Sequence, residues 1–164
     1  MKDKKSLIII FLVAVNIIVL NPTNFHLFKM SPALAQRISP SDVWQQVYKD
    51  FPELPPENQY ISRETGKIAE NNTLASRLLR YHIYIKGRSP IYRLDWKLTF
   101  ADYLGVNETM YNISYPGNDT LKNNPIDSDR AAIAKLTRNQ RNALIQVLIN
   151  IFTTSSENTP ASAM

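Results

Sequence analysis

Residues 137–152 read TRNQRNALIQVLINIF, and this stretch has the clearest apolar periodicity in the chain. Its large apolar side chains recur every three or four residues: Leu144, Val147, Leu148, Ile151 and Phe152. That spacing puts them along one face of a helix with 3.6 residues per turn. Thr137 is a typical N-cap, because its hydroxyl can accept a hydrogen bond from a backbone N–H of the first turn. The stretch therefore predicts an amphipathic helix that closes a helical domain.

Another helix is expected just before it, from Asp127 or Ser128 to Leu136. Acidic side chains at its start favour the positive end of the helix dipole. Residues 106–125 come before this helix and are rich in Asn, Gly and Pro, which favour turns. We expect a long loop there.

Two more helices are expected in the first half of the domain. One runs from Asp42 to about Phe51 behind the N-cap Ser41, and several prolines end it. The other begins behind the N-cap Thr73 and has one apolar stripe, formed by Leu74, Leu78, Tyr81 and Ile85. Between the two helices, residues 64–67 have the composition of a turn that joins short extended segments.

Residues 81–98 fit two different structures. Apolar and polar residues alternate strictly from Tyr92 to Phe100, which is the period of a half-buried strand. A β-hairpin within residues 81–98 is therefore one alternative. The other, which we favour, is an extended approach through Tyr92 followed by a helix that ends near Leu104. The whole pattern predicts a mainly α fold, a small single domain of about four to five helices.

The N-terminus has the features of a secretory signal peptide. Lysines come first and an apolar run follows over residues 7–20. The small residues Ala33 and Ala35 then occupy the positions that a signal peptidase recognises, with Gln36 as the new first residue. A retained membrane anchor is the alternative, although a helix needs about 20 apolar residues to cross a bilayer and this run is shorter. We therefore predict an exported protein.

These boundaries divide the chain into a signal peptide (1–35), a single globular domain (36–152) and a tail (153–164) whose Ser, Thr, Asn and Pro content predicts disorder. The full chain has 19 basic and 14 acidic residues, and residues 1–35 contain four of the basic and one of the acidic ones. The remainder has 15 basic and 13 acidic residues, a net charge of +2. The basic balance of the whole chain is therefore no argument for a nucleic-acid partner.

Several chemistries lack the residues that they need. The chain has no cysteine, which excludes a cysteine nucleophile and Cys/His zinc sites. It also has no Gly-rich phosphate loop and no calcium-loop spacing, so we expect no cofactor and no metal site. His82 is the one histidine after residue 35. A small hydrolase that uses His82, with Asp95 to orient it, or a carboxylate pair is the enzymatic alternative, although the sequence singles out no catalytic residue.

Residues 77–97 mix basic and aromatic side chains, and arginine and aromatic residues are enriched where proteins bind partners. The same mixture also suits anionic membrane surfaces, or a core of aromatics with the basic groups in solvent. We expect a protein partner before a membrane surface, and no nucleic acid, which an exported protein rarely meets. The candidate binding residues are Arg77, Arg80, Tyr81, His82, Tyr84, Arg88, Arg93 and Trp96.

Two stretches of the chain resemble small uncharacterised exported proteins of cyanobacteria. They are the junction Ala33-Leu34-Ala35-Gln36 and the stretch from Asn72 through Arg80-Tyr81-His82 to Asp95-Trp96-Lys97-Leu98. The resemblance implies a periplasmic or thylakoid-lumen location and no particular chemistry. The function expected from the sequence is that of a non-enzymatic accessory protein that docks on a protein or membrane complex.

Overall fold

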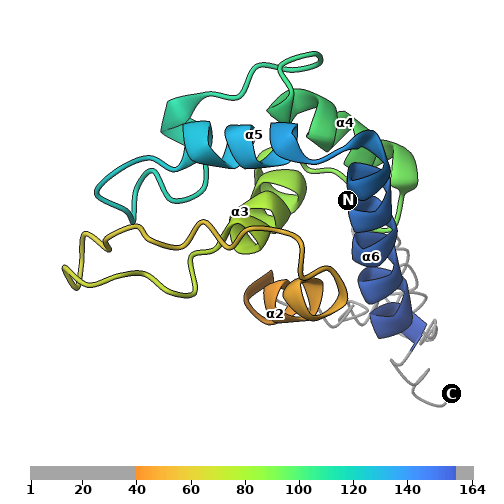
Figure 1. Ribbon diagram of the computed structural model, residues 1–164, viewed down its shortest axis with the longest axis horizontal. Helices are drawn as coiled ribbons and strands as arrows, with labels where there is room; N and C mark the ends of the chain where they lie inside the picture. The colour runs from red at the N-terminus through yellow and green to blue at the C-terminus, as the bar shows by residue number, and fades with distance from the viewer. Residues whose placement is uncertain (1–39, 158–164) are drawn as a thin grey trace, which may run out of the picture. The chain divides into compact units, whose positions relative to one another are not determined.

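The computed structural model describes residues 40–157, and this part of the chain is helical (Figure 1). Its helices are α2 (Pro40–Asp50), α3 (Leu74–Arg80), a π-helical turn (Tyr81–Ile85), α4 (Arg93–Tyr103), a 3-10 turn (Asn112–Ser114), α5 (Ile126–Lys135) and α6 (Arg138–Glu157). Within residues 40–157, β pairing is limited to two isolated bridges. The predicted mainly α fold is confirmed, and the alternative hairpin at residues 81–98 is wrong.

The remaining residues, 1–39 and 158–164, lie outside the described part. They include the predicted signal peptide, its cleavage site at Ala33, Ala35 and Gln36, and the end of the predicted tail. These features stay predictions. Within the described part, no helix is long and apolar enough to cross a membrane.

Helix α6 begins at the predicted N-cap. The Thr137 hydroxyl accepts a hydrogen bond from the Gln140 N–H at 3.2 Å, and the Gln140 side chain accepts one from the Thr137 N–H at 2.8 Å. This reciprocal capping box satisfies two backbone donors at the start of the helix. The helix continues to Glu157, so the prediction of disorder is wrong for residues 153–157.

Side chains from all five described helices, α2 to α6, build one core. Helix α2 packs on α3 and α6, and α4 packs on α5 and α6. The large side chains at these contacts are fully buried: Val47, Leu74, Leu78, Leu79, Trp96, Ile133, Leu144 and Leu148. Each buried Leu or Ile contributes about 1.5–3 kcal/mol relative to an exposed one. The apolar faces predicted for α2, α3 and α6 therefore form one core.

Helix α4 divides the alternating residues between two faces. Trp96 and Phe100 are buried, whereas Leu94 and Leu98 are 66% and 37% exposed. Positions i and i+4 share a helix face, so each apolar pair forms a stripe of its own. A strand would have placed all four on one side, which is why the alternation also fitted a strand.

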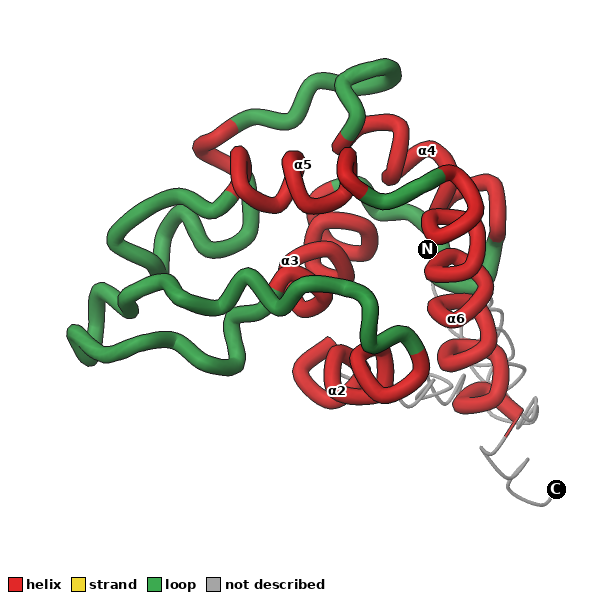
Figure 2. The backbone as a smooth tube through the Cα atoms, viewed as in Figure 1, coloured by secondary structure: helices red, strands yellow, loops and turns green. Residues whose placement is uncertain are grey.

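Two long loops run beside each other and extend away from the helices (Figure 2). The predicted turn at residues 64–67 is confirmed, because Ile61 pairs with Ile68 in an antiparallel bridge around it. Ser62 pairs with Leu121 in the second bridge, and the Lys122 N–H donates to the Ile61 carbonyl at 2.9 Å. These bonds hold the first loop against the loop that precedes α5.

Candidate binding site

Half of the predicted binding residues lie in the core instead of on the surface. Four of them are at most 1% exposed: Arg77, Tyr81, His82 and Trp96. A partner cannot reach these side chains, so the prediction that they form a binding surface is corrected. The other four remain accessible. Tyr84 and Arg93 are exposed, and Arg80 and Arg88 are half-buried.

Arg77 from α3 and Asp129 from α5 form a buried ion pair. Nε and Nη2 of Arg77 each donate to an oxygen of Asp129 at 2.6 Å, and neither side chain is exposed. The other Arg77 donors bind the carbonyl oxygens of Glu57, at 2.7 Å, and Asn72. Burial would lower the pKa of Arg77, but the hydrogen-bonded Asp129 carboxylate outweighs burial and raises that pKa. Arg77 therefore holds the fold together and presents no charge to a partner.

Buried tyrosines extend this network. The Tyr115 hydroxyl donates to Asp129 at 2.5 Å and lies 2.9 Å from the Tyr103 hydroxyl. Burial raises the pKa of both tyrosines well above the usual value, so both stay protonated and can donate. Burial also raises the pKa of the Asp129 carboxyl, and the hydrogen bonds from Arg77 and Tyr115 oppose that rise.

Arg88 belongs to a second polar network, near the end of α4. It donates to Asp102 at 2.5 Å and to Glu108 at 2.8 Å, and Lys86 donates to Glu108 at 2.7 Å. Burial would raise the pKa of the Asp102 carboxyl, but the hydrogen bonds from Arg88, the Glu108 N–H and Asn107, with the charge of Arg88, together outweigh burial and lower that pKa. The charges of Lys86 and Arg88 are thus already paired within the domain.

His82 is packed between polar groups and an aromatic ring. Its Nδ1 lies 2.8 Å from the Thr99 hydroxyl, its Nε2 lies 3.1 Å from the Ser89 carbonyl, and its ring stacks on Trp96 with centroids 3.5 Å apart. Burial lowers the pKa of His82 to about 4. Asp95 accepts a hydrogen bond from the Ser89 N–H at 3.0 Å and does not orient the imidazole. With both ring nitrogens occupied, His82 has no position from which to take a proton from a substrate.

Six large apolar side chains near α4 are exposed, with 37–66% of each in contact with solvent. We name them the 84–98 surface: Tyr84, Ile85, Ile91, Tyr92, Leu94 and Leu98. Arg93 and Lys97 lie in the same segment, and neither has a carboxylate within ion-pair distance among residues 40–157. Arg93 instead donates to the Gln146 side chain on α6 at 3.0 Å.

Sequence reasoning included only Tyr84 of this apolar set. Arginine and aromatic residues are the types enriched at interfaces, whereas Leu94 and Leu98 are aliphatic and belong to the alternating pattern. Their i, i+4 spacing was the available signal. On a helix that already buries Trp96 and Phe100, a second apolar stripe has to face outward.

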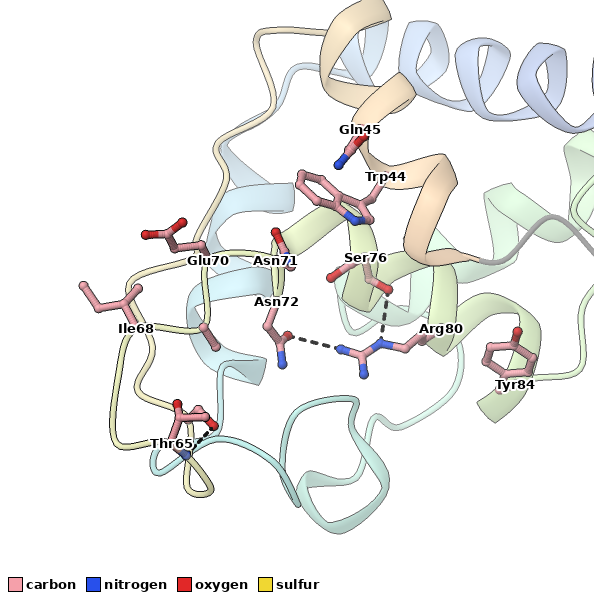
Figure 3. A pocket seen from close by; sticks show the side chains of 12 residues that line it. Trp44, Gln45, Thr65, Ile68, Glu70, Asn71, Asn72, Ser76, Arg80 and Tyr84 are labelled. Atoms are coloured by element: carbon pink, nitrogen blue, oxygen red, sulfur yellow. Dashed lines mark hydrogen bonds between the residues drawn. The ribbon is translucent and has the colours of Figure 1, made fainter.

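An open cavity of about 720 Å³ lies beside α3 (Figure 3). Its walls come from α2, from residues 62–72 and from α3 with its π-helical extension. The predicted residues Arg80 and Tyr84 both line it, together with Trp44 and Asn72. Sequence reasoning missed the cavity because its walls come from segments that only the tertiary fold brings together.

The described part of the chain contains no cluster of side chains that could bind a metal ion. Nowhere in it do three or more His, Asp or Glu side chains gather closely enough to hold a metal ion. Glu70 is the one acidic side chain among the described residues that lines the cavity.

Comparisons with known proteins give no relative for this chain: no protein-family model, no curated protein and no solved structure matches it.

Proposed function

We propose that this protein is an exported, non-catalytic accessory protein that docks on a protein partner through the 84–98 surface. The observation that carries the proposal is the exposure of six large apolar side chains within 15 positions of the chain, from Tyr84 to Leu98. Exposed apolar groups cluster where proteins interact, because water contact with them is unfavourable and a partner relieves it.

The charges nearby favour a protein partner over an anionic membrane. Six basic residues lie between positions 77 and 97. Arg77, Lys86 and Arg88 pair with carboxylates, and Arg80 lines the cavity. That leaves Arg93 and Lys97 for a partner. A cation near an anionic membrane contributes about 1 kcal/mol, so two of them bind such a surface weakly.

The composition of the 84–98 surface also resembles the centre of a protein interface. Such centres are apolar and aromatic, with few charges, and are surrounded by polar residues. We expect the partner to offer an apolar groove with acidic side chains opposite Arg93 and Lys97. The hydrolase alternative has no comparable support, because His82 has both nitrogens occupied and a single acidic residue of the described part lines the cavity.

The double variant Leu94→Glu/Leu98→Glu tests the proposal. Both side chains are exposed, so the fold should tolerate glutamate at these positions, whereas an apolar groove should not. Ile113→Glu is the matched control, since it changes an exposed apolar residue to glutamate outside the 84–98 surface. Each tagged protein is used to isolate partners from the extracytoplasmic and membrane fractions of the cell that makes it.

The expected result is a protein that co-purifies with the wild type and with Ile113→Glu and is lost with Leu94→Glu/Leu98→Glu. Circular dichroism of all three proteins should show the same helical content. If the same proteins co-purify with all three, or none with any of them, the proposal is wrong.

A further inference from the structure

The side chain of Arg80 lies in the cavity without a carboxylate partner. Its Nη2 donates to the Asn72 side chain at 3.1 Å and its Nε to the Ser76 carbonyl at 3.4 Å, and both acceptors are uncharged (Figure 3). No Asp or Glu of the described chain lies within ion-pair distance of it. Arg77 and Arg88, the neighbouring arginines along the chain, both have such partners. Arg80 therefore carries a positive charge that no described carboxylate binds directly.

The environment of Arg80 makes an added anion favourable. Burial and the positive charge of Arg77 lower the pKa of Arg80 and together outweigh the opposing charge of Asp119, so they disfavour the cationic form. An anion beside the guanidinium would offset both effects. Its Nη1 has no hydrogen-bond partner within residues 40–157, and Nη1 with Nη2 can bind two oxygens of one acid group.

The cavity has the size and composition of a small-molecule site. Its volume of about 720 Å³ is within the usual range of about 300–1,000 Å³ for ligand pockets. Trp44 and Tyr84 provide aromatic surface, and Asn72 provides a fixed polar group. In Figure 3 the Glu70 carboxylate points away from Arg80 and does not occupy the space beside the guanidinium.

We propose that this cavity binds a small organic carboxylate, with the carboxylate on Arg80 and an apolar or aromatic group against Trp44. Among the described residues, Arg80 is the one cation that lines the cavity, which suits one negative charge. Phosphate carries more charge and is usually held by several donors and cations, so a carboxylate fits the site better. The carboxylate can belong to a free metabolite or to the C-terminus of a peptide, and both present the same group to Arg80.

The test is calorimetry and NMR titration of the full-length protein with matched probes. The first pair is 3-phenylpropionate and its neutral amide, which differ only in the charged group. The second pair is a pentapeptide that ends in Phe, with a free and with an amidated C-terminus. Tighter binding of 3-phenylpropionate would indicate a free metabolite as the ligand, and tighter binding of the pentapeptide would indicate a peptide C-terminus.

The expected result is saturable binding of at least one carboxylate, with chemical-shift changes at the Trp44 indole and the Asn72 amide. The matching amide should bind at least tenfold more weakly, because a hydrogen bond to a charged group is lost. Arg80→Gln should weaken carboxylate binding by a similar factor, and Arg80→Lys by less. Arg138→Gln, at the exposed start of α6, is the control and should leave binding unchanged.

Three results would overturn the proposal: no binding of either carboxylate at millimolar concentration, equal binding of acid and amide, or full binding by Arg80→Gln. The comparison of acid and amide uses the wild type, so it decides the question even where a variant folds poorly. Leu94→Glu/Leu98→Glu should bind the carboxylate normally, which separates this site from the docking proposal.

Discussion

Arg77 and Asp129 are joined by two hydrogen bonds of 2.6 Å in the core, and solvent reaches neither side chain. They lie 52 positions apart in the chain, so the pair fixes α3 to α5. The same guanidinium holds the Glu57 carbonyl at 2.7 Å, which attaches the loop after α2. One buried cation therefore connects three segments of the chain.

Removing one partner of this pair should destabilise the domain strongly. Asp129→Leu leaves the Arg77 charge buried without a carboxylate, and such changes cost about 3–5 kcal/mol. The double variant Arg77→Met/Asp129→Leu removes both charges and should recover part of that loss. Urea unfolding at neutral pH, followed by circular dichroism, measures the free energy of unfolding of each protein.

The matched control for this experiment is Lys86→Met. It removes the ion pair between Lys86 and Glu108, which is exposed to solvent and should contribute little to stability. If Asp129→Leu and Lys86→Met lower the free energy of unfolding equally, the buried pair does not have the structural role assigned to it.

The stability of the domain should fall as the pH drops from 6.5 towards 4, because of His82. Burial holds its folded-state pKa at about 4, while a histidine in the unfolded chain has a pKa of about 6.5. In that range the unfolded state binds a proton that the folded state does not, so stability is complete above pH 6.5 and declines below it. The total loss near pH 4 is on the order of 3 kcal/mol.

Urea unfolding at several pH values between 7.5 and 4.5 checks this prediction. His82→Gln keeps a polar side chain at the position and removes the titrating group, so its stability should depend less on pH over the same range. Identical slopes for the wild type and His82→Gln would show that another group causes the pH dependence.

Periodicity predicted most of the fold because each helix buries one continuous stripe. Thr137 and Gln140 form a capping box, and Thr73 caps α3 by accepting a hydrogen bond from the Ser76 N–H at 3.2 Å. Hydrogen bonds between residues close in the sequence determine these helix N-termini, so the sequence alone can predict them. Helix α4 was ambiguous because it has two apolar stripes, and only the position of the core decides which of them is buried.

The candidate site was less predictable, because it depends on which basic and acidic side chains the tertiary fold pairs. A local excess of basic residues at positions 77–97 indicated a charged surface. Their partners Asp102, Glu108 and Asp129 follow later in the chain, and a reading of one segment cannot pair them. The same limit hid the cavity, where Trp44 and Arg80 come from different helices.

Charge reversal at Arg88 should destabilise the domain, whereas charge reversal at Arg93 should not. Arg88→Glu places a carboxylate beside Asp102 and Glu108 and leaves Asp102 buried without its cation, so we expect a loss of about 3–5 kcal/mol. Arg93→Glu changes an exposed residue and should stay within about 0.5 kcal/mol of the wild type. Thermal and urea unfolding of both variants measure the difference, and equal stability of the two would contradict the assigned network.

Binding to anionic vesicles should not depend on the 84–98 surface. Arg93 and Lys97 are the cations there without carboxylate partners in the described part, and two cations hold an anionic surface weakly at about 0.15 M salt. Cosedimentation of the wild type and of Leu94→Glu/Leu98→Glu with vesicles of phosphatidylcholine and phosphatidylglycerol should give equal bound fractions. The N-terminal residues are common to both proteins, so any contribution from them cancels in the comparison. A bound fraction that is larger for the wild type and falls steeply with added salt would identify a lipid surface, and not a protein, as the partner of these side chains.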